Sequence, residues 1–124
     1  METKKKVLIV DDEVDMLELL SLRLQAIGKY IVETATDGAM GLQKVGEFNP
    51  DIILLDVVMP TMDGWEVCRS IRSSLATKNI PVILITAAQA IDLEKKAKEV
   101  GANKVLVRPY KEQELFRIMQ DLLD

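Results

Sequence analysis

Residues 52–56 have the sequence IILLD, four consecutive large apolar residues closed by an aspartate. An unbroken apolar run is typical of a strand in a parallel sheet, because helices cover both faces of such a sheet and both faces must be apolar. The runs at 7–10 and 81–85 have the same character, and shorter apolar runs recur at 30–32 and 105–107. The chain therefore predicts five strands at regular intervals.

The segments between these runs carry apolar residues at helical spacing, which predicts helices that face the sheet. Four such stripes are present: Leu17, Leu20, Leu24 and Ile27 before Gly28; Val67, Cys68, Ile71 and Leu75 after Gly64; Leu93, Ala97 and Val100 before Gly101; and Leu115, Ile118, Met119 and Leu122. Strands that alternate with helices favour right-handed crossovers and one α/β, doubly wound, five-stranded parallel sheet with five helices.

The overall composition fits one compact domain that spans residues 1–124, with 48% hydrophobic and 29% charged residues. A formal net charge of −4 and a pI of about 4.9 make direct nucleic-acid binding unexpected. Cys68 is the one cysteine, which excludes an internal disulfide and a multi-cysteine metal site. Histidine is absent, which excludes histidine metal ligands and catalysis by a histidine base. No apolar run is long enough to span a bilayer, so we expect a cytoplasmic protein without a membrane partner.

Polar side chains follow the predicted strands, at the edge of the sheet where α/β proteins bind ligands. Asp11 and Asp12 follow the first strand, Asp56 the third, Thr86 closes the fourth and Arg108 follows the fifth. Clustered carboxylates repel one another unless a cation lies between them, and an all-oxygen set suits Mg²⁺, with Mn²⁺ as a second possibility. This edge of the sheet is therefore a candidate metal site suited to phosphate chemistry.

Several aspartates of the chain also have a purely structural interpretation. Asp12 is placed to cap the following helix, Asp37 precedes Gly38 as a turn or cap residue, and Asp63 resembles the first residue of a capping box with Glu66. For Asp63 the structural interpretation is the stronger one. Asp56 differs, because the segment that follows it contains Pro60 and no helix begins at once for it to cap.

Four segments in order, VLIVDDE (7–13), IILLDVVMPTMDG (52–64), VILITA (82–87) and VRPY (107–110), resemble the receiver domain of two-component response regulators. The resemblance covers the whole chain. It implies the flavodoxin-like, CheY-like three-layer sandwich with strand order 2-1-3-4-5. It also implies a phosphorylation-switched signalling domain.

By this resemblance, Asp56 accepts the phosphoryl group, while Asp11, Asp12, Asp56 and the backbone carbonyl of Val58 hold Mg²⁺. Thr86 corresponds to the family's switch hydroxyl. The implied donor is a phosphohistidine on a sensor histidine kinase or a histidine phosphotransfer protein, since this chain has no histidine. The implied output surface comprises the fourth helix, the fifth strand and the fifth helix, and its partner is unknown.

The chain departs from the family's pattern at two positions. Arg108 stands where a lysine is usual; it donates to phosphate with a larger, planar head group. Val105 stands where many receivers have a switching aromatic residue. The family also implies a cis Arg108–Pro109 bond. Val58 and Ala88 place apolar side chains at the two positions that, in receivers, influence how attacking water reaches the acyl phosphate. We therefore expect slow self-dephosphorylation and no enzymatic turnover beyond a slow autophosphatase activity.

Two alternatives to the phosphorylation switch remain open at this point. A pseudo-receiver would use the same fold only as a protein-binding surface, and Arg108 and Val105 favour that interpretation. A magnesium-dependent aspartyl-phosphate hydrolase would use the same nucleophile in turnover, although its usual acid-x-acid signature after the first strand is absent. We expect either a monomer or a homodimer that forms on phosphorylation.

Overall fold

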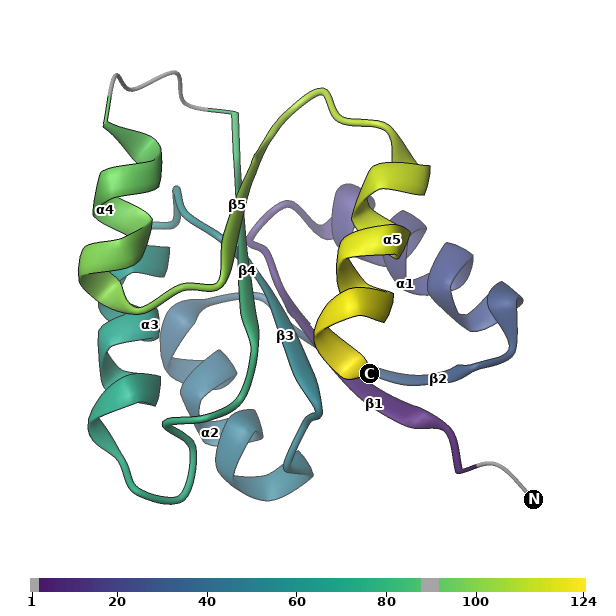
Figure 1. Cartoon of the computed structure of the whole chain (residues 1–124), viewed down its shortest axis with the longest axis horizontal. Helices are drawn as coiled ribbons and strands as arrows, with labels where there is room; N and C mark the ends of the chain where they lie inside the picture. The colour runs from purple at the N-terminus through teal and green to yellow at the C-terminus, as the bar shows by residue number, and fades with distance from the viewer. Residues whose placement is uncertain (1–2, 88–91) are drawn as a thin grey trace.

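A computed structural model of the chain describes residues 3–87 and 92–124. Strands and helices alternate along these residues, as predicted. Figure 1 shows the sheet in the middle with helices on both sides. In chain order the elements are β1 (Lys5–Val10), α1 (Val14–Ile27), β2 (Tyr30–Ala35), α2 (Gly38–Phe48), β3 (Ile52–Asp56), α3 (Gly64–Ser73), β4 (Val82–Thr86), α4 (Leu93–Val100), β5 (Lys104–Val107) and α5 (Glu112–Leu123).

The sheet is parallel with the order β2-β1-β3-β4-β5, which confirms the predicted doubly wound topology. Each neighbouring pair of strands is parallel, and the register places Val10 beside Leu55 and Asp56 beside Ile85. The chain winds outward in opposite directions from β1, so the switch in winding lies between β1 and β3. The carboxyl ends of these two strands are therefore the expected ligand-binding edge.

Two hydrophobic cores lie on opposite faces of the sheet. One core includes Val45 of α2, Val67 of α3 and Val100 of α4; the other includes Leu17 of α1 and Leu115 of α5. Figure 1 shows the same division, with α2, α3 and α4 on one side of the sheet and α1 and α5 on the other. The predicted three-layer sandwich is confirmed.

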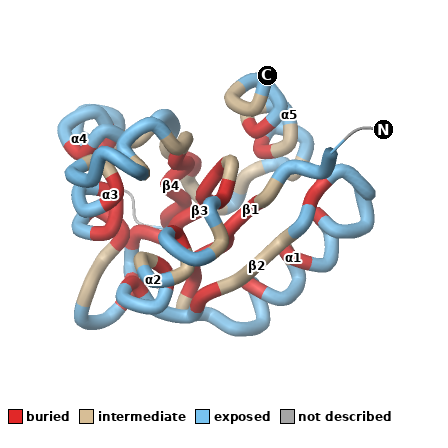
Figure 2. The backbone as a smooth tube through the Cα atoms, turned by 90° about the horizontal axis from the view of Figure 1, so that it is seen from below, coloured by how far each residue is buried: buried red, intermediate tan, exposed pale blue. Residues whose placement is uncertain are grey.

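Burial is greatest in the two neighbouring strands β3 and β4. Every residue of β3 and of β4 is buried, whereas the edge strands β2 and β5 include exposed or half-buried positions. In Figure 2, β3 and β4 are largely red, whereas β2 is partly tan. An acid that closes β3 is consequently held by a backbone with little freedom to move, because buried strands resist local opening.

Helix ends follow the local signals in the sequence. Gly101 caps α4 with a positive φ of 84°, as predicted, and Gly28 caps α1 in the same conformation. Asp37 accepts a hydrogen bond from the Met40 amide at 2.7 Å, and Asp63 accepts one from the Glu66 amide at 2.9 Å. Both aspartates are therefore confirmed as cap residues.

Two residues of the predicted stripes do not reach the core, and Ile27, the last residue of α1, is 39% exposed. Leu75 is 85% exposed, because α3 ends at Ser73 and Ser74 adopts an extended conformation, which turns the chain away from the sheet. The prediction that Leu75 packs on the sheet is wrong. The Arg108–Pro109 peptide bond is cis, as the family resemblance implies.

Candidate functional site

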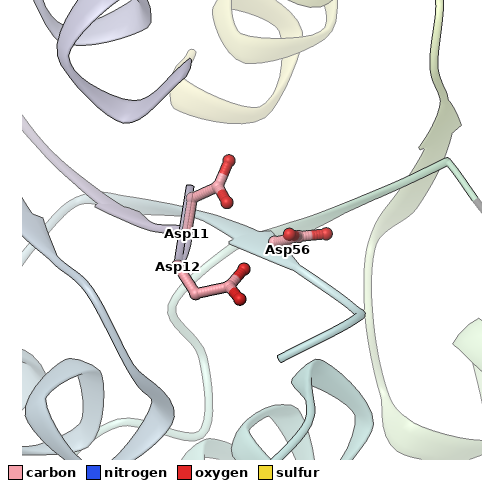
Figure 3. Close-up of side chains that lie close together, drawn as sticks. All are labelled: Asp11, Asp12 and Asp56. Atoms are coloured by element: carbon pink, nitrogen blue, oxygen red, sulfur yellow. The ribbon is translucent and has the colours of Figure 1, made fainter. Parts of the chain in front are cut away.

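The carboxyl ends of β1 and β3 bring together three aspartates. Val10 pairs with Leu55 in the sheet, so Asp11 and Asp56, one residue further along each strand, emerge side by side. One carboxylate oxygen from each of Asp11, Asp12 and Asp56 lies within 4.8 Å of the other two. Figure 3 shows the three side chains close together at the ends of their strands. The acids that the sequence places in one candidate site are therefore adjacent in space.

Two of these acids are removed from water. Asp11 is 4% exposed and Asp56 is 5% exposed, whereas Asp12 is more accessible. The pKa of Asp56 is raised from 3.8 to about 6, mainly by burial and then by the nearby Asp11 carboxylate, while Arg108 and the Val58 amide act in the opposite direction. The site thus carries excess negative charge that its own cation does not fully balance.

Arg108 contacts two of the three acids. Its Nη2 donates a hydrogen bond to Oδ2 of Asp11 at 3.0 Å, and its Nη1 lies 3.5 Å from Oδ1 of Asp56. The Arg108 amide donates to the Thr86 carbonyl at 2.8 Å, which fixes the start of the side chain at the end of β4. The guanidinium therefore spans the space between β1 and β3.

Asp11 also organises the entry to α1. Its Oδ1 accepts a hydrogen bond from the Glu13 amide at 2.9 Å. Glu13, and not Asp12, occupies the N-cap position of α1, and no side-chain cap bond is formed there. The structural interpretation of Asp12 as a helix cap is therefore wrong, and its carboxylate is left to face the other two acids.

The loop after β3 is tied to the strand ends by backbone hydrogen bonds. The Val57 amide donates to the Ile85 carbonyl at 3.0 Å, and the Gly64 amide donates to the Val57 carbonyl at 2.8 Å. Between them, the Val58 amide lies 3.4 Å from Oδ1 of Asp56, and the Val58 residue is 59% exposed. Val58 thus lies beside Asp56 at the open side of the site.

The remaining predicted site residues lie on the neighbouring strand. Thr86 closes β4 and is fully buried, one position beyond the residue that pairs with Asp56. Ala88, predicted to influence access of water, lies outside the described residues.

The donor set of the site fits a hard divalent cation. Three carboxylates supply only oxygen, and among residues 3–87 and 92–124 their ion pairs are with Arg108 alone. Magnesium binds through one or two carboxylates and retains several waters, which suits a site that is open on the side of Asp12. When bound, the ion would neutralise the approach of an anionic substrate to Asp56.

The family of the chain follows from comparison with known proteins. Residues 7–120 match the family described as the response regulator receiver domain. The chain belongs to this family. The receiver is 35% identical to the solved chemotaxis protein CheY4 of Vibrio cholerae, with a TM-score of 0.90 over 98% of this chain and 100% of that one.

Longer regulators are also similar to this receiver. Response regulator PleD of Caulobacter vibrioides is 40% identical over 94% of this chain but only 26% of its own length. The DNA-binding dual master transcriptional regulator RpaA of Synechocystis is 33% identical over 95% of this chain and 48% of its own length. The chain thus spans about half, or less, of the curated relatives that it matches. No helix among residues 3–87 and 92–124 is long and apolar enough to cross a membrane.

Sequence reasoning missed two features of the site. Arg108 was expected to face a phosphoryl group, and its ion pair with Asp11, 97 residues away, was not foreseen. The close packing of Gly64 against the Asp56 backbone at the end of β3 is likewise not indicated by the cap signal of Asp63. A glycine directly after that cap is the one sequence signal that could have indicated close backbone approach.

Proposed function

We propose that this receiver is a phosphoacceptor switch in which Asp56 takes a phosphoryl group from a phosphohistidine on a sensor histidine kinase or a histidine phosphotransfer protein. The gathering of Asp11, Asp12 and Asp56 from two strands within 4.8 Å supports this proposal most directly. A purely structural scaffold has no need for buried acids that destabilise one another. Residues 1–124 then form a single receiver domain.

Mg²⁺, or Mn²⁺ in its place, would be held by Asp11, Asp12, Asp56 and the backbone carbonyl of Val58. The position of Val58 beside Asp56 supports its inclusion. In the transfer, an oxygen of the Asp56 carboxylate attacks phosphorus and forms an acyl phosphate. The bond between phosphorus and the donor imidazole nitrogen breaks, and its electron pair remains on that nitrogen, which takes up a proton.

Thr86 and Arg108 are the residues that would respond to the new phosphoryl group. Thr86 ends the strand next to Asp56, and Arg108 already lies 3.5 Å from the Asp56 carboxylate. A phosphoryl group adds nearly two negative charges and three strong acceptors, which a hydroxyl and a guanidinium both satisfy. The change would be read on the surface formed by α4, β5 and α5.

The side chain beside Asp56 bears on how long a phosphoryl group would persist there. The exposed apolar side chain of Val58 offers no hydrogen bond to an attacking water, so dephosphorylation would be slow and enzymatic turnover absent. The protein would act in the cytoplasm without direct contact to nucleic acid or membrane. It would act as a monomer or as a homodimer that forms on phosphorylation.

Phosphorylation with acetyl phosphate and Mg²⁺ tests the assignment of Asp56, with intact mass as the readout. Wild type and Asp51→Asn should each gain one phosphoryl group, and Asp56→Asn should gain none. Asp51 is a suitable control because it is also a strand-adjacent aspartate, but its carboxylate accepts the Lys6 amide at 2.8 Å, away from the site. Asp12→Asn should greatly slow the reaction, since the acceptor is retained and a metal ligand is lost.

The same samples separate the rival functions. An unmodified wild type would favour a pseudo-receiver that works only as a binding surface. Continuous release of phosphate from phosphomonoesters, with many turnovers per protein, would favour an aspartyl-phosphate hydrolase. A single modification that persists for minutes after removal of acetyl phosphate supports the switch.

A further inference from the structure

Both carboxylate oxygens of Asp11 are already engaged. Oδ1 accepts the Glu13 amide at 2.9 Å, and Oδ2 accepts Nη2 of Arg108 at 3.0 Å. On Asp56, Oδ1 faces both Nη1 of Arg108 at 3.5 Å and the Val58 amide at 3.4 Å. Arg108 therefore already contacts one carboxylate oxygen on each of two acids of the candidate metal site.

Arg108 is held in this position at a cost. Its Nε is buried and has no hydrogen-bond partner within the described part of the chain. A buried unpaired donor is unfavourable, so the two ion pairs must offset that loss as well as the restriction of a long side chain. The observed position of the guanidinium therefore depends on its ion pairs with Asp11 and Asp56.

Space for a second position of the side chain lies next to the site. Arg108 lines a pocket of about 390 Å³ together with Met16, Pro109, Tyr110 and Glu112. Glu112 provides a carboxylate in that pocket, although it also pairs with Arg23 at 2.9 Å. A guanidinium released from the acids thus has room and a second anion within the same pocket.

We propose that Arg108 is the counter-ion of the metal-free site and that a divalent cation must displace its guanidinium from Asp11 in order to bind. The inference rests on the proposed function and adds a determinant of metal affinity to it. Magnesium binds carboxylate oxygens at about 2.1 Å with strict octahedral geometry, which an N–H donor on the same oxygen obstructs. Repulsion between the two cations acts in the same direction. The displaced guanidinium is then free to pair with a phosphoryl group on Asp56.

Titration calorimetry of Mg²⁺ binding, without any phosphoryl donor, tests the displacement. Arg108→Gln should bind Mg²⁺ about tenfold more tightly than wild type, the equivalent of one charge-assisted hydrogen bond. Arg108→Lys should fall between the two, since an ammonium keeps the charge but lacks the planar fork that reaches both carboxylates. Arg117→Gln, which removes an exposed arginine of α5, should remain within about twofold of wild type because solvent and salt screen surface charge.

A second measurement follows the guanidinium itself. In ¹⁵N-labelled protein, the Nε–H signal of Arg108, assigned by its loss in Arg108→Lys, should shift on addition of Mg²⁺. The proposal is overturned if Arg108→Gln and Arg117→Gln have the same Mg²⁺ affinity, or if the Arg108 signal does not respond to the ion. Circular dichroism confirms that each variant is folded, and Arg108→Lys carries the test if Arg108→Gln is not.

The measurements distinguish failure of the displacement proposal from failure of the proposed phosphorylation switch. Wild type that binds Mg²⁺ but is not phosphorylated on Asp56 would overturn the switch, while the order of affinities would still decide the role of Arg108. Phosphorylation of Asp56 without the expected order would overturn the displacement alone. Absence of Mg²⁺ binding in wild type and all variants would overturn both.

Discussion

Gly64, the first residue of α3, lies directly against the backbone of Asp56. A Cβ on Gly64 would lie well under 3.0 Å from the Asp56 carbonyl oxygen, and the Gly64 amide donates to the Val57 carbonyl at 2.8 Å. No side chain fits between α3 and the end of β3. α3 and the end of β3 are thus fixed to one another by backbone contact, which holds Asp56 in place at the site.

Gly64→Ala should lower the free energy of unfolding by about 2 kcal/mol, because the added methyl group forces the backbone apart in a packed region. Chemical denaturation measures the change. Gly46→Ala is the matched control: Gly46 is an exposed residue of α2 with nothing within 4 Å of a Cβ. That variant should gain about 0.5–1 kcal/mol from better helix propensity. Equal effects of the two substitutions would contradict close packing at Gly64.

The raised pKa of Asp56 predicts how the metal-free protein responds to pH. Its folded pKa of about 6 exceeds 3.8, so ionised Asp56 opposes folding above pH 6. The free-energy cost of ionised Asp56 in the folded state falls as the pH is lowered from about 6 to 3.8. In that range Asp56 is protonated in the folded chain but ionised in the unfolded chain. In chelator at pH 7, Asp56→Asn should therefore be more stable than wild type by about 1–3 kcal/mol.

Denaturation of the two proteins across the pH range gives the comparison. The stability difference should narrow toward pH 4 and should shrink or reverse at pH 7 when Mg²⁺ is added, since the ion stabilises only the carboxylate form. Asp121→Asn, at an exposed position of α5, controls for loss of one negative charge. If the free energies of unfolding of wild type and Asp56→Asn differ by the same amount at all pH values, the raised pKa of Asp56 is contradicted.

The fold could be predicted from sequence because its determinants are local. An uninterrupted apolar run such as that of β3 indicates burial on both faces, and Gly101 after Val100 indicates where α4 ends. Leu75 shows the limit of this reasoning: it continues the helical spacing of Ile71, but Ser74 leaves the helix and exposes Leu75. Periodicity identifies a face, whereas the backbone decides where that face stops.

The site could be predicted only in part. Strand ends in a parallel sheet meet at one edge, which is why Asp11, Asp12 and Asp56 could be grouped from sequence alone. The ion pair between Arg108 and Asp11 depends on the direction of a long side chain, which no spacing rule specifies. The placement of Glu13 at the N-cap, with Asp12 left toward the site, likewise depends on a one-residue offset at the helix start.

Thr61 has a φ of 70°, a left-handed conformation that a β-branched residue adopts only with strain. Asparagine tolerates this conformation, so Thr61→Asn should raise the free energy of unfolding by about 1 kcal/mol. The reciprocal change provides the control. Asn49 caps α2 with a φ of 52°, and Asn49→Thr should be destabilising by a similar amount. Thermal unfolding in chelator tests both; a loss of stability in Thr61→Asn would contradict the account of backbone strain.

Arg72, near the end of α3, joins three segments through its guanidinium. Nε donates to the Gly101 carbonyl at 2.8 Å, Nη1 to the Ile80 carbonyl at 2.7 Å, and Nη2 to Oδ1 of Asn103 at 3.0 Å. The same Asn103 oxygen accepts the Val82 amide at 2.9 Å, so Arg72 supports the start of β4 as well as the C-cap of α4.

Arg72→Ala should therefore lower the free energy of unfolding by about 1–3 kcal/mol, since three hydrogen bonds are lost together. Arg72→Lys should recover only a small part, because an ammonium does not reproduce the planar set of donors. Arg69→Ala, at an exposed position of the same helix, should change stability by about 0.5 kcal/mol or less. Amide hydrogen exchange should show the largest loss of protection in Arg72→Ala at α4 and the start of β4. Protection lost evenly over the whole chain would instead mean that Arg72 contributes only to global stability.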